Sequence, residues 1–367
     1  MHVAKAYPSN YIQEKGIIDK AGEWVEKFGT TPFVLSGPTA WSKVSAPFTK
    51  SLSESGLDYT LEFFEGHCSD QEVQRVLSQV PSSVDVIVGV GGGQCVDTAK
   101  LVANRLNLPV LNISTLASTC AASAAQSIIY TPEHVFVRVE PFDHSPVAVL
   151  VDPDIIRDAP MRYLSAGIGD TLVKWYEAMP LNEGKVQNAM TKVGLKIAEL
   201  IRDLLFEFSE QAIRDCEKGE TSESLRQVID ANILLGGLVG GLGRHTCASS
   251  GAHAIHYGMT VIPEMKDAFH GELVAYGLLC QFKLEGKKDQ EIIDFMRFYQ
   301  KINLPISLKD LGMKNLSEED LRLAAQKACA PERTIHHLPF AILEEHVYQA
   351  IIDINELGEA IKSEVTL

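Results

Sequence analysis

Residues 84–100 read VDVIVGVGGGQCVDTAK, an apolar run that passes through glycines 89 and 91–93 into a segment of helical period. A buried strand followed by a glycine-rich turn and a helix is typical of a phosphate-binding βαβ unit. Glycines there let backbone N–H groups approach a phosphate, and the helix N-terminus adds partial positive charge. A tight turn without a ligand is the alternative, but three consecutive glycines favour phosphate binding.

The same strand and helix patterns surround this stretch from residue 32 to residue 153. Short apolar runs predict strands at 32–37, 57–64, 84–90, 109–114 and 146–153. Amphipathic segments lie between them, for example at 69–80 and 95–106. This alternation predicts a Rossmann-like, mostly parallel sheet with helices on both faces. Residues 127–140 predict a hairpin inserted into that scheme.

The pattern changes after Asp152. Long stretches of helical period follow at 161–179, 185–217, 222–240, 246–260, 270–285, 288–301 and 344–362. We place a boundary near residue 155, where DPDIIRDAP predicts a helix start. The sequence therefore predicts an α/β dinucleotide-binding domain over residues 1–155 and an all-helical domain over residues 156–367.

Composition excludes several classes of partner. The chain has 367 residues, 46% hydrophobic and 22% charged, with a net charge of -15. This acidity argues against nucleic acid and anionic membrane surfaces, which reward clustered Lys and Arg. The first 16 residues lack the pattern of a secretory signal, and we find no apolar run long enough to span a membrane. Seven scattered cysteines without a CxxC pair predict a reducing, cytoplasmic location.

The glycine run departs from the common dinucleotide fingerprint, because Gln94 stands where that pattern needs a glycine. It also lacks the Gly-Lys-Ser/Thr of a P-loop. It does match G-x-G-G-G-x-x-x-D-x-x-K, with Asp97 and Lys100. That pattern resembles the glycerol dehydrogenase branch of the metal-dependent, iron-containing alcohol dehydrogenase family.

Further blocks extend the resemblance from about residue 30 to the end of the chain. In family order they are GHCSDQEV (67–74), TLASTCAASAAQSIIYT (115–131), GIGDTLVKWYEA (167–178), AHAIHYG (252–258), FHGELVAYG (269–277) and TIHHLPF (334–340). The resemblance implies the dehydroquinate synthase-like fold of that family, with the metal and the catalytic groups in the helical domain. It also implies an enzyme that transfers a hydride between NAD(P) and a CH–OH group.

The resemblance carries three metal ligands onto this chain: Asp170, His253 and His270. The iron branch of the family adds a histidine four residues after the aspartate, where this chain has Lys174. A protonated lysine does not ligate, so we expect zinc rather than iron. A carboxylate with two imidazoles also suits zinc by its own chemistry. His256 lies one helical turn from His253, and we expect it to face the substrate, carry a proton or orient the metal shell.

The resemblance also implies the cofactor contacts. Gly91, Gly92, Gly93, Gln94 and Asp97 belong to the pyrophosphate turn and its helix. Thr115 and Ser118 occupy positions that hold the nucleotide, and the nicotinamide side is lined by Ala124, Gln126 and Tyr130.

Two departures from the family pattern bear on specificity. Cys120 stands where glycerol dehydrogenases carry an aspartate that helps bind polyol. Loss of that acceptor and its charge disfavours glycerol and favours a 2-hydroxy or 2-oxo carboxylate. Family members with the same Thr-Cys pair resemble hydroxycarboxylate dehydrogenases. Gly37-Pro38 stands where NAD-selective members carry an aspartate, so we expect dual or NADP preference.

Alternatives remain beside this interpretation. A glycerol dehydrogenase that produces dihydroxyacetone is the nearest one. A dehydroquinate synthase-like lyase shares the fold, but it needs a basic pocket that these motifs do not supply. An inactive relative serving as a binding module is a third, against which the intact Asp170, His253 and His270 argue. The resemblance further implies a small-molecule substrate and a homo-oligomer, a dimer or larger.

Overall fold

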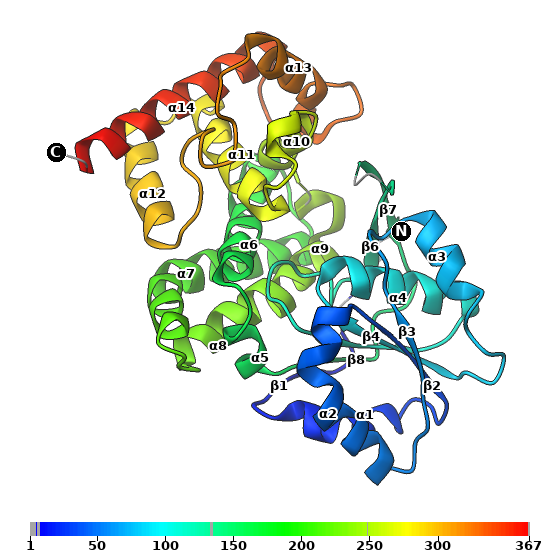
Figure 1. The fold of residues 1–367 in the computed structure, drawn as a ribbon. Helices are drawn as coiled ribbons and strands as arrows, with labels where there is room; N and C mark the ends of the chain where they lie inside the picture. Colours follow the sequence, from blue (N-terminus) through cyan, green and yellow to red (C-terminus); the bar gives the residue numbers. More distant parts are fainter. Residues whose placement is uncertain (1–4, 6–7, 133–134, 248, 366–367) are drawn as a thin grey trace. The chain divides into compact units, whose positions relative to one another are not determined.

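The computed structural model describes Lys5 and residues 8–132, 135–247 and 249–365 of the chain (Figure 1). The chain packs into two compact units. One comprises Met1–Leu164 and Arg214–Leu242, and the other comprises Ser165–Ile213 and Gly243–Leu367. The helical segment 214–242 therefore packs with the first unit, although it follows residue 155. The division of the chain into two domains at residue 155 stays a prediction.

The first unit is built on a six-stranded sheet in the order β1-β8-β5-β4-β2-β3. Its strands are β1 (Tyr11–Gln13), β2 (Pro32–Ser36), β3 (Thr60–Phe63), β4 (Val86–Gly91), β5 (Val110–Ser114) and β8 (Ala148–Val151). Every pairing in the sheet is parallel, which confirms the predicted Rossmann-like sheet. The short strand β1 was not predicted, because its three residues are too few for a periodic signal.

Both faces of this sheet are covered, as the unbroken apolar runs of β2 and β4 require. Alternate residues such as Val34 and Val88 pack in one core cluster with Phe48 of α2 (Pro38–Glu54). Their neighbours, such as Ile87, pack in a second cluster with Val76 of α3 (Asp70–Leu77). The second cluster also includes residues of α4 (Gly93–Leu106), the helix that follows the glycine turn.

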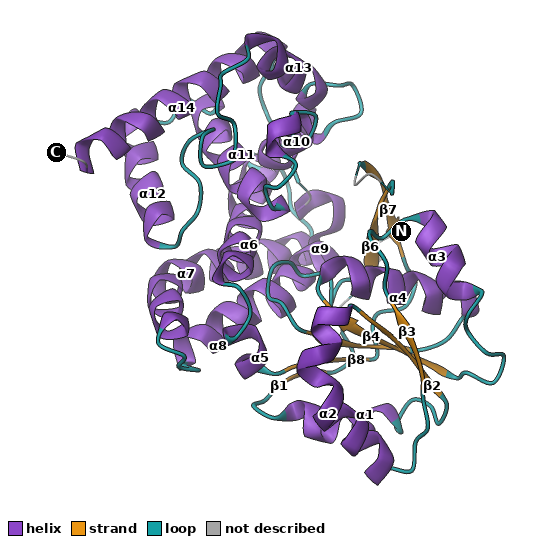
Figure 2. Ribbon diagram, in the orientation of Figure 1, coloured by secondary structure: helices purple, strands orange, loops and turns teal. Residues whose placement is uncertain are grey.

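The predicted hairpin is present as β6 (Gln126–Tyr130) and β7 (Phe136–Pro141), which pair antiparallel. In Figure 2 the strands are confined to the N-terminal half of the chain, and the chain from α10 onward consists of helices and loops. This agrees with the prediction of an α/β region followed by a helical one.

Most of the remaining helices follow the predicted periods. They are α1 (Ala21–Val25), α5 (Pro153–Arg157), α6 (Met161–Asn182), α7 (Ala189–Glu217), α8 (Glu223–Asp230), α9 (Gly236–Gly243), α10 (Gly251–Met259), α11 (His270–Leu284), α12 (Asp289–Lys301), α13 (Glu318–Ala328) and α14 (Glu344–Val365). A π-helical segment, Ala231–Leu235, joins α8 to α9. Short 3-10 helices occur at Ile17–Lys20, Arg244–Cys247, Pro263–Met265 and Thr334–His337. Helices α1 and α13 were not predicted.

One helical stretch corrects the expectation that no segment is long and apolar enough to cross a membrane. Glu223–Cys247, 25 residues long, meets that criterion by length and mean hydropathy. Because 56% of its most apolar window is buried inside the protein, it also fits the core helix of a soluble protein, and it is weak evidence for a membrane.

Helix α4 packs so closely on β4 that Gly89 has no space for a side chain. A Cβ at Gly89 would lie 2.7 Å from Ala99 Cβ and 2.8 Å from Asn112 Oδ1. We expect Gly89→Ala to lower the free energy of unfolding by about 1–3 kcal/mol, the usual cost of overpacking. Urea unfolding measures this loss. Gly37→Ala is the control, because no atom lies within 4 Å of the Cβ it would add; equal losses in the two variants would contradict the packing argument.

Candidate functional site

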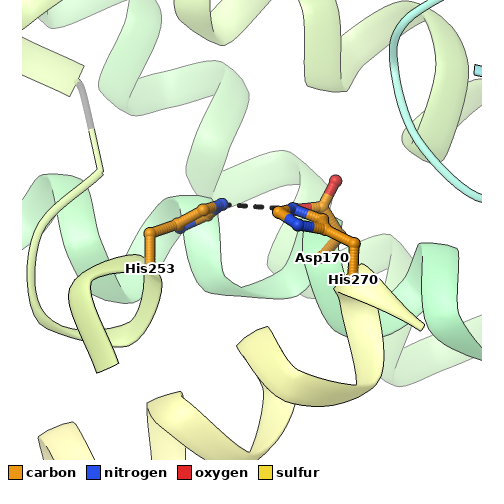
Figure 3. Close-up of side chains that lie close together, drawn as sticks. All are labelled: Asp170, His253 and His270. Carbon is orange, nitrogen blue, oxygen red and sulfur yellow. Dashed lines mark ion pairs between the residues drawn. The ribbon is translucent and has the colours of Figure 1, made fainter. Parts of the chain in front are cut away.

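Three side chains of the second unit converge from three helices (Figure 3). Asp170 belongs to α6, His253 to the first turn of α10, and His270 is the first residue of α11. Asp170 Oδ1 lies 3.4 Å from His253 Nε2 and 3.3 Å from His270 Nε2. One ligand atom from each residue lies within 4.8 Å of the others. The structure thus brings together the three predicted ligands.

Close packing of α11 on α6 produces this convergence. A Cβ at Gly271 would lie 1.8 Å from the carbonyl oxygen of Ala166, so no other residue permits the two backbones to approach this far. The first turn of α11 therefore lies directly against the turn of α6 that precedes Asp170. In the dipeptide His270-Gly271, the histidine is the predicted ligand, and the glycine permits the close helix approach that brings it to Asp170.

The charges around the cluster lower the pKa of Asp170 and raise that of His253. Burial opposes ionisation of the Asp170 carboxyl, but hydrogen bonds from His253 and His270 and the charge of Lys174 hold its pKa well below its usual value. Burial likewise disfavours protonation of His253, yet the carboxylates of Glu177 and Asp170 raise its pKa to about 9. Two imidazole nitrogens from half-buried histidines and an oxygen of the buried Asp170 carboxylate fit the ligand set of a zinc site with an open position.

His256 contacts the cluster without joining it. Its Nε2 lies 3.2 Å from His270 Nδ1, so it is placed to orient the His270 ring. Burial and the neighbouring His270 and His253 lower its pKa well below the usual value, which keeps this imidazole neutral. In the described part of the chain its Nδ1 has no hydrogen-bond partner.

Glu177 is a site residue that sequence reasoning missed. Its side chain is 2% exposed, and Oε2 lies 2.6 Å from His253 Nδ1. It stands two helical turns beyond Asp170 on α6, so both carboxylates lie on one face of the helix. That spacing within GDTLVKWYE was the signal that could have indicated it.

The glycine turn leads into α4 as predicted. Gly92 is the N-cap and the helix begins at Gly93, with both residues half-buried. Gln94 Oε1 accepts a hydrogen bond from the backbone N–H of Cys68 at 3.2 Å and lies 3.0 Å from His67 Nδ1. The Gln94 side chain therefore supports the segment that leads into α3.

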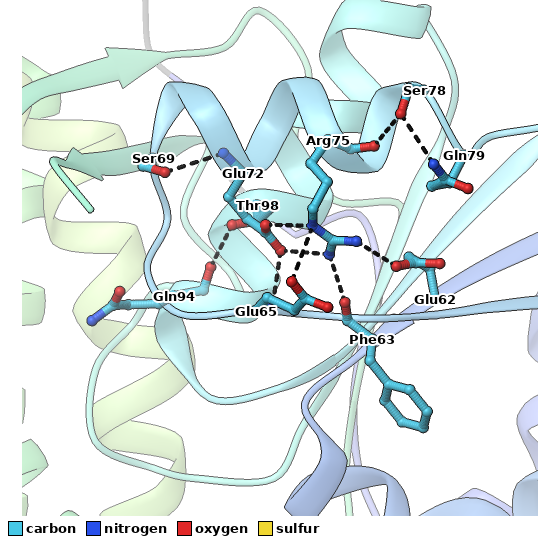
Figure 4. Close-up of polar contacts among 10 residues, drawn as sticks. All are labelled: Glu62, Phe63, Glu65, Ser69, Glu72, Arg75, Ser78, Gln79, Gln94 and Thr98. Carbon is cyan, nitrogen blue, oxygen red and sulfur yellow. Dashed lines mark hydrogen bonds and ion pairs between the residues drawn. The ribbon is translucent and has the colours of Figure 1, made fainter. Parts of the chain in front are cut away.

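The start of α3 is itself held by a polar network (Figure 4). Ser69 accepts the N–H of Glu72 and caps the helix. Arg75 binds Glu72 at 2.7 Å and donates to the carbonyl of Phe63, which ties α3 to the end of β3. These contacts fix the start of α3, directly after the segment that Gln94 supports.

Buried side chains hold the carbonyl groups of the segment after β5. Lys100, 1% exposed, donates to Ala121 O at 2.7 Å and Ala124 O at 3.0 Å, and it pairs with Asp97 at 2.7 Å. Asp97 also accepts the N–H of Ile128 at 2.9 Å. Asp97 thus lies in the interior beneath this segment; its direct contact with a cofactor stays a prediction.

A second set of bonds holds the same segment from β5 and from the π-helical segment. Asn112 donates to Ala122 O at 2.8 Å, and Asn232 of the π-helical segment donates to Ala117 O at 2.9 Å. A π-helical turn inside a helix often marks a functional site. The protein's own side chains therefore hold several backbone carbonyls of this segment.

The remaining predicted cofactor residues lie on this segment. Thr115 is buried and donates its N–H to Gly91 O at 3.1 Å, and Ser118 is half-buried. Cys120 is half-buried and packs against buried Ala124. Gln126 is exposed at the start of β6, and half-buried Tyr130 ends that strand.

Comparison with known proteins identifies the family. Residues 8–153 match the model of the iron-containing alcohol dehydrogenase family. The chain is 39% identical to hydroxycarboxylate dehydrogenase A of Escherichia coli over 91% of this chain and 92% of that protein. It is 34% identical to a glycerol dehydrogenase of Thermotoga maritima over 97% of this chain and 98% of that protein. The chain belongs to the iron-containing alcohol dehydrogenase family.

Its fold agrees with this membership along the whole chain. The crystal structure of glycerol dehydrogenase from Schizosaccharomyces pombe superimposes with a TM-score of 0.91 and 30% identity, covering 100% of this chain and 93% of that one. This confirms the predicted fold and the glycerol dehydrogenase-like branch. As a member of a family of metal-dependent, nicotinamide-linked dehydrogenases, the protein is an oxidoreductase that acts on CH–OH groups.

The stability of the protein is expected to depend on the buried Lys100. Lys100→Met removes the counter-charge of Asp97, whose pKa burial already raises, and frees the carbonyls that Lys100 held, so we expect a loss of about 3–5 kcal/mol in unfolding free energy. Adding Asp97→Asn should restore part of it. Urea unfolding measures both variants. Lys196→Met, at a lysine whose side chain is 81% exposed, is the control; a Lys100→Met loss as small as the control's would refute a clamping role.

Proposed function

We propose that this dehydrogenase interconverts a 2-hydroxy and a 2-oxo carboxylate with NAD(P). The observation that carries the substrate class is Lys174, a half-buried lysine one helical turn beyond Asp170, close enough that its charge lowers the pKa of the Asp170 carboxyl. A substrate carboxylate gains a charge-assisted interaction from such an ammonium group, whereas a neutral polyol does not. Cys120, in place of the aspartate that the family uses for polyol, supports the same class.

Asp170, His253 and His270 are the proposed ligands of one divalent ion, and zinc is proposed over iron because Lys174 replaces the fourth histidine of the iron branch. When bound, such an ion supplies a Lewis acid that polarises the substrate carbonyl. His256 keeps the His270 ring turned so that Nε2 faces Asp170. Its neutral imidazole, with Nδ1 unpartnered among the described residues, is also the proposed carrier of the proton that accompanies the hydride.

The cofactor is proposed to bind the first unit. The N-terminus of α4, from Gly91 to Gln94, offers backbone N–H groups and a partial positive charge to the pyrophosphate. The segment after β5, residues 115–130, is proposed to contact the nucleotide through Thr115 and Ser118. It is proposed to contact the nicotinamide through Ala124, Gln126 and Tyr130.

Glycerol dehydrogenase activity is the second candidate, and the 34% identity with the enzyme of Thermotoga maritima supports it. The convergence of Asp170, His253 and His270 argues against an inactive binding module. We further propose a homo-oligomer in the cytoplasm. Support for the compartment comes from the seven cysteines, all of which are free thiols.

Removal of the metal should abolish activity. Each of the three side chains offers one ligand atom, so the loss of any one weakens the proposed site. We expect Asp170→Ala, His253→Ala and His270→Ala each to lower kcat by at least about a thousandfold, in line with loss of several kcal/mol of transition-state stabilisation. EDTA should inactivate the wild-type protein, and zinc should restore it. Elemental analysis is expected to find one zinc per chain. Activity indifferent to EDTA in a metal-free preparation would contradict the proposal.

Lys174→Met should separate the two substrate classes. We expect kcat/KM for 2-oxo acids to fall about ten- to hundredfold, the value of a hydrogen bond to a charged group, with little change for neutral aldehydes or dihydroxyacetone. The assay follows NAD(P)H oxidation across such a panel. Lys192→Met, at an exposed lysine of α7, is the matched control. A wild-type preference for dihydroxyacetone, or equal losses for all substrates, would favour the second candidate.

Cofactor choice depends on the end of β2, where Gly37 and Pro38 offer no carboxylate to repel a 2′-phosphate. We therefore expect kcat/KM with NADPH to equal or exceed that with NADH. Initial rates at varied cofactor concentration measure the ratio, and a tenfold preference for NADH would overturn this expectation.

A further inference from the structure

Glu177 joins two elements of the second unit that the proposed metal site needs. It projects from α6 toward the N-terminus of α10, and its side chain is 2% exposed. Its Oε1 accepts the backbone N–H of Ser250 at 2.7 Å and that of His253 at 3.0 Å. Glu177 therefore caps α10 from another helix, and the positive end of the α10 dipole stabilises its charge.

The second carboxylate oxygen contacts the imidazole itself. Oε2 lies 2.6 Å from His253 Nδ1. A carboxylate offers only acceptors, so the proton in this contact belongs to Nδ1 of His253. In the neutral ring, Nε2 then carries the lone pair, and Nε2 is the atom that faces Asp170.

One residue thus controls both the position and the tautomer of His253. The two backbone bonds place the first turn of α10, and the third bond sets the rotation of the ring within it. The partner of His270 differs, because the neutral imidazole of His256 takes that place and an imidazole is a weaker acceptor than a carboxylate.

We propose that Glu177 is a positioning residue that holds His253 as the Nδ1–H tautomer and thereby sets the affinity of the site for a divalent ion. This inference rests on the proposed metal site. Partners that fix the tautomer of a ligating histidine typically change metal affinity about 10- to 100-fold when they are substituted.

Glu177→Gln is the sharpest test, because it separates capping from orientation. The amide oxygen can still accept both N–H groups of α10, so the fold is retained. The amide nitrogen is a donor and faces Nδ1, which favours the opposite tautomer with the proton on Nε2. We expect the zinc Kd, measured by competition with a chromogenic chelator, to rise about 10- to 100-fold, with an unchanged melting temperature.

Glu285→Gln is the matched control. Glu285 is a half-buried carboxylate of the same unit, and it accepts a hydrogen bond from Gln281 at 2.7 Å. Its substitution removes the same charge, and we expect a zinc Kd within twofold of wild type. A Kd for Glu177→Gln that is also within twofold of wild type would overturn the proposal.

The tautomer can be observed without metal. In chelator-treated, ¹⁵N-histidine-labelled protein at about pH 10, above the raised pKa of His253, the ring resonances of His253, assigned through His253→Ala, should report a proton on Nδ1 in wild type and on Nε2 in Glu177→Gln. An unchanged tautomer overturns the proposal even if the variant binds zinc weakly. An Asp170→Ala variant that binds zinc as tightly as wild type would instead refute the metal site itself, and the positioning role with it.

Discussion

The candidate metal site depends on one packing constraint, the contact between the backbones of α6 and α11. Gly271 lets the first turn of α11 lie on the carbonyl of Ala166. That approach brings His270 to within 3.3 Å of Asp170, and the buried carboxylate then requires partners for its charge. His253 supplies the second partner because Glu177 anchors α10 to the same helix. Close packing and charge compensation thus act on the same few residues.

In the first unit, a buried carboxylate near the glycine turn is likewise compensated by a neighbouring side chain. A buried lysine, Lys100, compensates the buried Asp97 and uses its remaining donors on backbone carbonyls. Neither side chain needs to touch a ligand to matter for binding. Each holds a segment whose backbone is proposed to contact the cofactor, and a segment held in this way loses little entropy on binding.

Much of the architecture was predictable because local patterns repeat along it. The strands β2, β4, β5 and β8 are buried throughout and mostly apolar, and they carry the signal of a buried parallel strand. Strand β1 and helices α1 and α13 were not predicted. The first two span three and five residues, too few for a periodic signal, and α13 lies in a turn-rich region. The segment 214–242 was assigned by its order in the chain, whereas packing places it with the first unit.

The sequence by itself determined the family and, through its motifs, the identity of Asp170, His253 and His270 as candidate ligands. Those motifs are local, and a residue type at a given spacing can be read directly. Only the tertiary structure decided how these residues are supported. Glu177 acts on His253 across 76 positions of the chain, and Lys100 acts on carbonyls more than 20 positions away. Such contacts follow from which faces are buried together. The spacing within GDTLVKWYE places Glu177 on the face of α6 that carries Asp170, but it does not identify His253 as its partner.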